Sequence, residues 1–406
     1  MYLLKRSILI SLWFVFLTLP LLIVRVDTTN DLIEWQPHTL IYVGVGSFLL
    51  YLGWSLAIRY RDRQRRREEV ALPTSSELYE ALTDNKKVAI SFNLALVTVI
   101  LLMPFISSGY QVNIMISALI YVIIGLGLNI VVGFAGQLVL GYAAFYAVGA
   151  YTFGLLNMYF GVGFWLALPI GAGVAGLFGI IVSLPVIRLR GDYLAIVTLG
   201  FGEITRLVLQ NWVELTNGPG GIDKIPQPEF FNFVMDDPST TKYIYYITCA
   251  LALVAFMSLI RLKNSRVGRS WLAVSEDETA AQVMGINTTW AKLSAFALSA
   301  VWAGVAGVLF ATKTRFINPD SFTFMDSALF LCIVVLGGMG SIYGMLVGAF
   351  AIALLPEYLR AFSDYRMLMF GAAMVLMMIF RPQGLIPPKV RTYKVSKLKK
   401  NKGVES

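Results

Sequence analysis

The chain has 406 residues, of which 57% are hydrophobic and 14% are charged, and its mean hydropathy is +0.70. About a quarter of the residues of a soluble domain are charged, so this chain has too few to cover a water-exposed surface. A single histidine (His38) and two cysteines (Cys249 and Cys332) exclude a His/Cys metal cluster, a Cys/His catalytic pair and a disulfide framework. The composition predicts an all-α, polytopic transmembrane helical bundle with neither catalytic residues nor a metal site.

The formal net charge of +9 is spread over short stretches between apolar runs, a pattern that does not indicate nucleic-acid binding. Lys and Arg gather near 59–67, 188–190, 261–269 and 389–402, whereas the loops at 27–34 and 214–237 are acidic. Because cytoplasmic loops of membrane proteins are enriched in Lys and Arg, both termini are expected in the cytoplasm.

Twelve apolar runs are candidate membrane segments, since one crossing needs ~20 mostly apolar residues. They lie near 8–24, 40–58, 88–106, 112–132, 138–160, 164–187, 193–212, 243–260, 293–311, 326–336, 342–359 and 367–381. The 326–336 run is too short to cross alone and is expected to be a half-helix or re-entrant element, so about 10 to 12 membrane segments are predicted. The first run lacks a small-residue cleavage site and is expected to remain as an uncleaved anchor.

Three regions follow from these runs. Residues 1–87 are expected to form an N-terminal extension with two spans and a basic cytoplasmic linker. Residues 88–385 form the predicted membrane core, and 386–406 a basic cytoplasmic tail. The arginine-rich linker is interpreted as a topology determinant, with binding to anionic lipid as the alternative.

The sequence GVAG occurs at 173–176 and at 304–307, and each copy precedes a similar decapeptide, at 194–203 and 331–340. In the expected topology the two copies cross in opposite directions. This predicts an inverted repeat, an arrangement that encloses the pathway of many transporters, and the alternative is chance similarity between apolar segments. Small residues that lie four positions apart on a helix, such as Ala300 and Gly304, are expected to let the backbones of neighbouring helices approach closely.

Three glycine clusters, at 133–136, 200–202 and 337–340, are expected to break or turn helices. Glu203 and Arg206 lie three residues apart, on one helix face, where they serve either structure or function. Candidate pathway residues are Asn129, Gly133, Gly136, Gln137, Gly200, Gly202, Glu203, Arg206, Gly337, Gly338 and Gly340. The amides of Asn93, Asn113, Asn129 and Gln137 are expected to bond across helices, and Glu357 and Arg360 to form an interfacial pair.

One short helix is predicted over 276–287, in a basic loop between apolar runs. Ser275 is its expected N-cap, with Glu278 three residues later, and Gly285 is its expected end. A helix this short is marginal in water, so its apolar surface must be buried by this protein or by a cytoplasmic partner. The residues assigned to this contact are Ser275, Glu276, Asp277, Glu278, Ala280, Ala281, Val283, Met284 and Gly285.

No nucleotide site is expected in the chain itself. The phosphate-binding motif GxxxxGKS or GxxxxGKT does not occur in the sequence, and the glycine-rich stretch at 217–224 has the wrong spacing. That stretch is interpreted as a turn-rich loop, and no cofactor is expected to bind the chain directly.

Five stretches resemble the permeases of branched-chain amino-acid ABC importers. They are GLGLNIVVGFAGQLVLGYAAFYAVGAY (125–151), RLRGDYLAIVTLGFGEITR (188–206), NGPGGI (217–222), EDETAAQVMGIN (276–287) and VVLGGMGSIYG (334–344). The likeness extends from about Val88 to Gln383, and the two additional N-terminal spans resemble the M-type permease subunit.

The resemblance implies a permease subunit in the bacterial inner membrane that forms half of a heterodimeric pathway. Its implied partners are a second related permease, two cytoplasmic ATP-binding subunits that carry ATP and Mg, and a periplasmic substrate-binding protein. The 276–287 segment would be the coupling helix that docks into an ATPase. The family often has Arg just before the Glu-Asp pair, where this chain has Ser275.

The substrate implied is a branched-chain amino acid. A permease for urea, short amides or a wider range of amino acids is an alternative within the same family. A self-sufficient secondary transporter or channel is an alternative of another class, and it would need a titratable relay for which Glu203 is nearly the only deep carboxylate.

Overall fold

The computed structural model describes residues 24–27, 32–35, 103–105, 107–187, 189, 191–228, 237–358, 371–372, 375 and 384–386. It divides into two units, Met1–Tyr79 and Glu80–Ser406. In the first unit, strands β1 (Val24–Asp27) and β2 (Leu32–Trp35) pair in an antiparallel hairpin. The hairpin differs from the connecting loop that the sequence predicts there.

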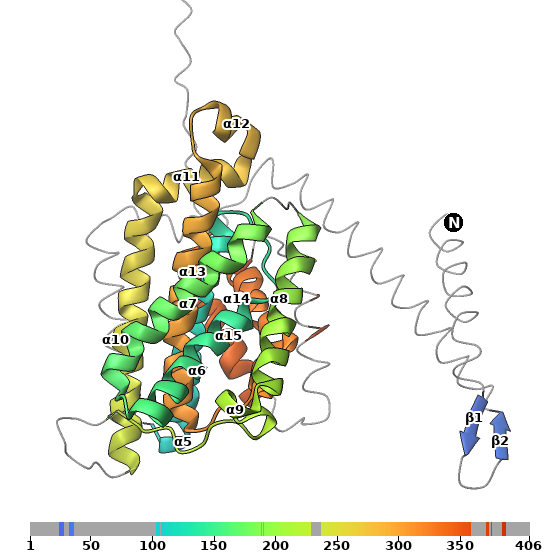
Figure 1. Ribbon diagram of the computed structural model, residues 1–406, viewed down its shortest axis with the longest axis vertical. Helices are drawn as coiled ribbons and strands as arrows, with labels where there is room; N and C mark the ends of the chain where they lie inside the picture. The colour runs from blue at the N-terminus through green and yellow to red at the C-terminus, as the bar shows by residue number, and fades with distance from the viewer. Residues whose placement is uncertain are drawn as a thin grey trace, which may run out of the picture. The chain divides into compact units, whose positions relative to one another are not determined.

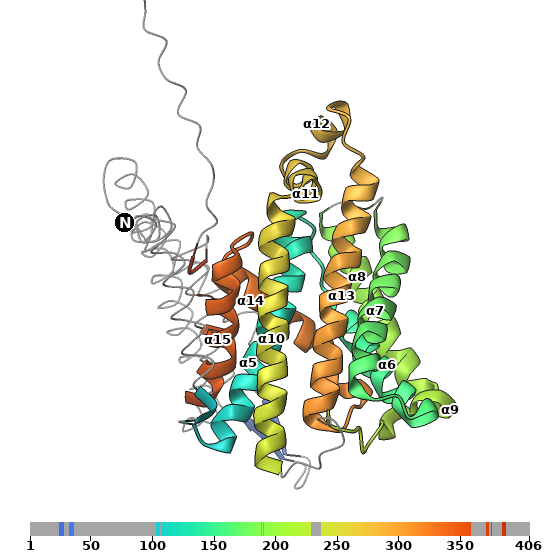
Figure 2. The same cartoon turned by 90° about the vertical axis from the view of Figure 1, so that its left-hand side faces the viewer.

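The second unit is a helical bundle (Figure 1). Its helices are α5 (Gly109–Asn129) with a π-helical turn (Ile130–Phe134), α6 (Tyr142–Phe160), α7 (Phe164–Val186), α8 (Asp192–Asn211), α9 (Val213–Thr216), α10 (Asp237–Asn264), α11 (Arg266–Glu276), α12 (Glu278–Val283), α13 (Thr288–Thr314), α14 (Phe324–Gly337) and α15 (Ile342–Tyr358). Helices α11 and α12 lie at one end of the bundle, here called the elbow end, and α9 lies at the other (Figures 1 and 2).

Five of the described helices are long and apolar enough to cross a membrane: Gly109–Phe134, Phe164–Val186, Ser239–Asn264, Thr288–Thr314 and Pro319–Gly337. The last of these includes a 3-10 turn (Pro319–Ser321) ahead of α14. Each predicted run from 112–132 to 342–359 corresponds to a helix, with some ends displaced. The all-α, multi-pass membrane bundle is confirmed, whereas the runs at 8–24, 40–58, 88–106 and 367–381 lie largely outside the described residues.

Helices α6, α7 and α13 pack with their backbones almost in contact, because glycines lie where they meet. A Cβ added to Gly304 would lie 2.6 Å from the Cβ of Ala175 and 2.8 Å from the carbonyl oxygen of Gly171. A Cβ on Gly307 would lie 2.1 Å from the carbonyl oxygen of Tyr146 on α6. The two GVAG copies thus contact each other, as the small-residue spacing predicts.

The two GVAG helices run in opposite directions. Gly171 of α7 lies beside Val308 of α13, and further along α7 Gly179 lies beside Ala300. This course agrees with an inverted repeat. The matched decapeptides, however, differ in structure, because 194–203 lies within α8 whereas 331–340 crosses the end of α14 into a turn.

Two helices of the bundle begin in its interior. The hydroxyl of Tyr142, the first residue of α6, donates to the carbonyl oxygen of Ser299 near the middle of α13, at 2.8 Å. Near the start of α14, the Ser327 hydroxyl accepts a hydrogen bond from the Ala143 backbone N–H at 2.9 Å. The starts of α6 and α14 therefore lie beside each other, inside the bundle.

Two irregular segments lead to these starts from opposite ends of the bundle. Residues 135–141 leave the elbow end, where Gly136 lies against Ser275 of α11. Residues 315–323 leave the α9 end, where Ile317 forms a β-bridge with Ile222. The run at 326–336, predicted to be too short to cross alone, corresponds to α14, which begins at Phe324 and ends at Gly337. Together with the 3-10 turn before it, this helix is long enough to cross a membrane, so the predicted shortness is wrong.

The glycine clusters at 133–136 and 337–340 break helices as predicted, and Gly136, Gly338 and Gly340 have positive φ angles. The prediction for Gly200–Gly202 is wrong, because α8 continues through it without interruption. A Cβ at Gly202 would lie 3.0 Å from the Cα of Gly141. The small residue here admits a neighbouring backbone instead of breaking its own helix.

Replacing Gly304 by Leu is expected to lower the thermal unfolding midpoint of the purified protein, because overpacking this contact costs about 1–3 kcal/mol or more. Gly173, in the other GVAG copy, is a matched control, since a Cβ there meets no atom within 4 Å. Gly173→Leu is expected to leave the midpoint nearly unchanged. Equal midpoints for the two variants would contradict the assigned packing.

Candidate functional site

Backbone and side chains from three helices meet at the interior starts of α6 and α14. The backbone N–H of Leu140 donates to the hydroxyl of Thr198 on α8, at 3.1 Å. A Cβ on Gly141 would lie 1.9 Å from the Thr198 carbonyl oxygen, so this backbone touches α8 directly. The broken helices and α8 thus form one junction, here called the broken-helix junction.

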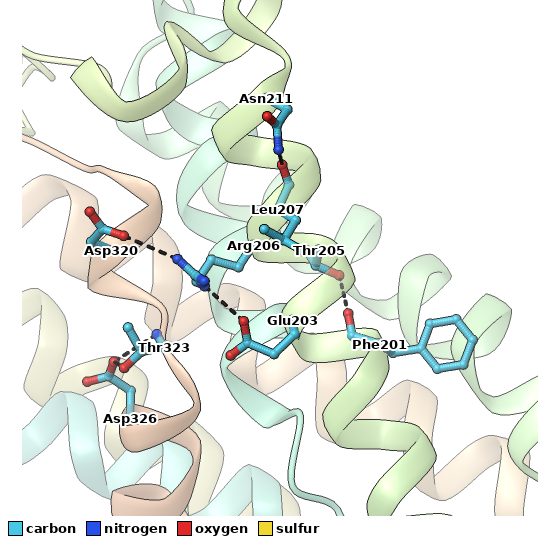
Figure 3. Close-up of polar contacts among 9 residues, drawn as sticks. All are labelled: Phe201, Glu203, Thr205, Arg206, Leu207, Asn211, Asp320, Thr323 and Asp326. Carbon is cyan, nitrogen blue, oxygen red and sulfur yellow. Dashed lines mark hydrogen bonds and ion pairs between the residues drawn. The ribbon is translucent and has the colours of Figure 1, made fainter.

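The predicted pair of Glu203 and Arg206 lies at this junction (Figure 3). Arg206 Nε lies 3.0 Å from Glu203 Oε2, which confirms that the two side chains share a helix face. Arg206 also reaches across to Asp320 of the irregular segment, at 3.3 Å. Two carboxylates therefore share one guanidinium, and the three side chains together carry a formal charge of −1.

Asp326 also lies beside the junction (Figure 3). Its carboxylate accepts from the Thr323 backbone N–H at 2.9 Å and from the Thr323 hydroxyl at 2.7 Å. These bonds form a capping box at the start of α14. The start of α6, in contrast, has neither a side-chain cap nor an acidic residue in its first turn.

A small, partly open cavity lies between α8 and the starts of α6 and α14. Its lining combines Leu140, Leu199, Phe322 and Phe324 with the polar side chains of Glu203, Thr323 and Ser327. The volume at its centre is about 10 Å³, close to what a single water molecule needs. The junction is therefore closed in this conformation.

The second break, between α14 and α15, is held to the end of α5. The backbone N–H of Gly340 donates to the side-chain oxygen of the fully buried Asn129, at 2.9 Å. Gly133 permits this approach, because a Cβ there would lie 1.9 Å from the same oxygen. Lys263 of α10 donates to the Gly340 carbonyl oxygen at 3.4 Å and lies over the Phe134 ring, at 5.6 Å.

The other predicted polar contacts have mixed outcomes. The side-chain amide of Gln137 is buried and has no hydrogen-bond partner among the described residues, so its predicted bond across helices is wrong. Asn113 bonds within its own helix, to the Gly109 carbonyl oxygen at 3.3 Å. Glu357 accepts from the Tyr110 hydroxyl, whereas Arg360 and Asn93 lie outside the described residues.

The short predicted helix is present as α12, but it begins later than expected. Asp277 is its N-cap, and the carboxylate accepts from the backbone N–H groups of Thr279 (2.8 Å) and Ala280 (3.0 Å). The Ser275 cap is wrong, because Ser275 lies in α11 and donates to the Leu272 carbonyl oxygen. Gly285 ends the turn with φ of +85°, as predicted.

The apolar surface predicted for this helix divides into two parts. Ala281 is buried against the bundle, whereas Val283 and Met284 are 82% and 81% exposed. Ala280 is also exposed. The exposed part lies at the tip of the elbow end, where α12 projects beyond the bundle (Figure 2).

Buried contacts tie the elbow to the bundle. The ammonium of Lys292, on α13, lies 2.6 Å from the Glu278 carboxylate of α12 and donates to the Ile187 carbonyl oxygen after α7, at 3.3 Å. The indole N–H of the fully buried Trp271 donates to the Ser294 hydroxyl of α13, at 3.1 Å. These contacts join α11 and α12, together called the elbow, to α13 as one connected element.

The residues predicted from the sequence did not include Lys292, Trp271 or Asp320. Lys292 is a cation close to an apolar run, and a charged residue there should have indicated a buried partner. Asp320 stands in Asn-Pro-Asp-Ser, a turn sequence whose tertiary partner, Arg206, has no local signal.

Comparison with known proteins agrees with these features. The family model for the branched-chain amino acid transport system / permease component matches residues 110–378. The high-affinity branched-chain amino acid transport system permease protein LivM of Salmonella typhimurium is 48% identical over 316 residues, covering 73% of this chain and 74% of its own. The protein of the same name from Escherichia coli is 43% identical over 316 residues, with the same coverage.

A more distant relative is the high-affinity branched-chain amino acid transport system permease protein LivH of Salmonella typhimurium. It is 30% identical over 189 residues, which cover 44% of this chain and 60% of its own. No solved structure matches the chain. The chain therefore belongs to the family of branched-chain amino acid transport system permease components.

Proposed function

We propose that this chain is the transmembrane permease subunit of an ATP-driven importer of branched-chain amino acids, and that separate cytoplasmic ATPases act on it through the elbow. The observation that carries the proposal is the exposed tip of α12 in a member of this permease family. Val283 and Met284 present apolar surface there, beyond the end of the bundle. A helix of six residues would not persist in water without support, and an exposed apolar tip on a supported helix suits a protein partner.

The elbow end would then face the cytoplasm. The basic residues Arg261, Lys263, Arg266 and Arg269 lie at this end, in the last turn of α10 and the first turns of α11. The acidic 214–237 loop begins at the α9 end. This distribution is the one expected when Lys and Arg mark the cytoplasmic side, and the membrane would be the bacterial inner membrane.

The buried contacts of the elbow supply a route for force. A push on α12 reaches α13 through Glu278 and Lys292, and it reaches α7 through the Ile187 carbonyl oxygen. The same elbow touches segment 135–141, where Gly136 lies against Ser275. Closure of the ATPases would therefore shift both the α7–α13 pair and the segment that leads into the broken-helix junction.

The remaining parts of the importer are proposed from the family. A second, related permease would complete the pathway, as the relatives in Salmonella typhimurium include two different permease proteins for high-affinity branched-chain amino acid transport. A periplasmic binding protein would deliver the substrate, and ATP and Mg would bind the ATPases, leaving this chain without a cofactor. A permease for urea, short amides or a wider range of amino acids would share this architecture.

A secondary transporter working alone is the contrasting function. It would need a titratable relay, but Glu203 is paired with Arg206 in this conformation. Purification separates the two functions. Co-isolated ATPases and vanadate-sensitive uptake of leucine support the importer, whereas leucine transport by the chain alone would contradict it. Competition of labelled leucine uptake by unlabelled amino acids and urea identifies the substrate class.

Replacing Val283 or Met284 by Asp is expected to abolish ATP-dependent leucine uptake in proteoliposomes that contain the whole importer. A buried apolar contact at an interface is worth about 2 kcal/mol or more, and a carboxylate there also loses its hydration. Because both side chains are exposed, the unfolding midpoint should stay unchanged. Val213→Asp, at an exposed position on α9, is the control and should keep uptake. Normal uptake by both the Val283→Asp and the Met284→Asp variants would contradict the proposed coupling of the elbow to the ATPases.

Lys292→Met and Glu278→Gln are each expected to reduce uptake per ATP hydrolysed, because each leaves one partner of a largely buried pair uncompensated. Removal of one partner from a fully buried pair costs about 3–5 kcal/mol, and less is expected here because the Glu278 side chain is 22% exposed. The double variant should recover part of the lost stability. The coupling energy between the two side chains, obtained from the unfolding midpoints of the single and double variants, should be about 0.5–3 kcal/mol. Strictly additive losses would show that the pair does not transmit force.

A further inference from the structure

We infer that the cavity at the broken-helix junction is the closed form of a transient binding site for a zwitterionic aliphatic amino acid. The inference rests on the proposed function and assigns it a place in the protein. Three properties of the cavity carry it: an apolar wall, a carboxylate shared with an arginine, and a mobile side.

The apolar wall suits an aliphatic side chain. Leu140 comes from the segment before α6, Leu199 from α8, and Phe322 and Phe324 flank the start of α14. Phe322 is itself fixed by aromatic contacts, since its ring lies 5.4 Å from that of Tyr146 and 5.8 Å from that of Phe310. A rigid aromatic on one side and leucines on the other give a pocket that responds to the size of an alkyl group.

The polar side suits an ammonium group. Glu203 is the one ionisable side chain among the described lining residues, and the hydroxyls of Thr323 and Ser327 lie in the same wall. Glu203 can share its charge with a ligand without stranding its partner, because Arg206 keeps a second carboxylate in Asp320. The formal charge of −1 on these three side chains is offset when an ammonium arrives.

The carboxylate of the ligand would lie at the start of α6, beside the polar wall, because Gly141 there contacts Gly202, next to Glu203. Gly141 and Ala143 line the cavity, and the first turn of α6 has no acidic residue, although the Ser327 hydroxyl already accepts from the Ala143 N–H. The positive end of a helix favours an anionic group, whereas the start of α14 already holds the carboxylate of Asp326. The two charged ends of a zwitterion are thus accommodated by two adjoining elements, α8 and the start of α6.

The cavity must widen to admit an amino acid, and α8 is the side that can move. Only Leu194, Ala195 and Thr198 of this helix are buried, whereas its later half is exposed or half-buried. Its contacts with segment 135–141 include the close approach of Gly202 to Gly141 and the hydrogen bond from the Leu140 N–H to the Thr198 hydroxyl, and neither interlocks large side chains. Outward displacement of α8 would therefore open the cavity while the α6–α7–α13 packing stays intact.

The test measures uptake of leucine and of valine by the whole importer in proteoliposomes, with the binding protein saturated by each substrate. Leu199→Phe is expected to reduce leucine uptake about tenfold more than valine uptake, since one methylene in an apolar pocket gives roughly that discrimination. The ratio does not depend on how much of the variant folds. Leu207→Phe, at an exposed position of α8 outside the lining, should leave the ratio unchanged.

A second variant tests the polar wall. Glu203→Gln is expected to reduce uptake of leucine and valine equally, by about tenfold, because both substrates have the same ammonium group. Glu214→Gln, on α9, is the matched carboxylate control and should retain uptake of both.

The outcomes separate this inference from the function on which it rests. Absence of ATP-dependent leucine uptake by the wild-type importer would overturn the proposed function. Normal wild-type uptake with the same leucine-to-valine ratio in Leu199→Phe would overturn the binding site alone. Wild-type uptake levels in Glu203→Gln would remove the ammonium contact and with it the zwitterion assignment.

Discussion

A backbone N–H that leaves a helix inside a bilayer finds no water, and leaving it unpaired costs several kcal/mol. Both breaks in this bundle satisfy that constraint with side chains from elsewhere in the chain. Thr198 accepts from Leu140, Ser327 accepts from Ala143, and Asn129 accepts from Gly340. These three bonds connect α5, α6, α8 and α14 at their irregular parts. Any motion that opens a pathway here must break these hydrogen bonds and give each backbone N–H another acceptor. The hydroxyl and amide side chains that accept these bonds therefore identify the moving segments better than the charged residues do.

Close packing and loose packing are divided between different helices. Gly149, Gly304 and Gly307 bring α6, α7 and α13 together at backbone distance, and Lys292 and Trp271 fasten the elbow to α13. These elements behave as one body, because their backbones touch at the glycines and the ring contacts of Phe145 with Phe178 and of Tyr146 with Phe310 join them further. Helix α8 has few buried residues and meets the others through glycines, the Thr198 hydroxyl, the ion pair of Arg206 with Asp320 and a few partly buried side chains such as that of Phe201. Force that enters at the elbow would thus move the packed body relative to α8, and the broken-helix junction lies on the boundary between them.

The helices could be predicted because transfer into lipid depends mainly on local composition. The runs predicted at 164–187 and 342–359, for example, correspond to α7 (Phe164–Val186) and α15 (Ile342–Tyr358). The end of the short helix at Gly285 could also be predicted from the local sequence, because the residue at this position has a positive φ angle, which favours glycine. The Ser275 cap failed because α11 continues to Glu276, held by the burial of Trp271, which then leaves Asp277 as the first extended residue. Gly202 was interpreted as a break, yet its role depends on Gly141, which lies opposite only after folding. Arg206 and Asp320 are 114 residues apart, so no spacing rule could have joined them.

The bundle has few charged residues, and this limits which solutes can pass through it. An ion would need compensating groups along its whole route, whereas a zwitterion has no net charge and needs opposite charges only where it pauses. The junction offers one such place, because the Glu203 carboxylate, which is paired with Arg206, lines the cavity together with the start of α6, whose first turn has no acidic residue. Elsewhere along the route, backbone dipoles exposed at the breaks would suffice. On this account, the same breaks that make the helices movable also provide the polar groups that a small amino acid requires.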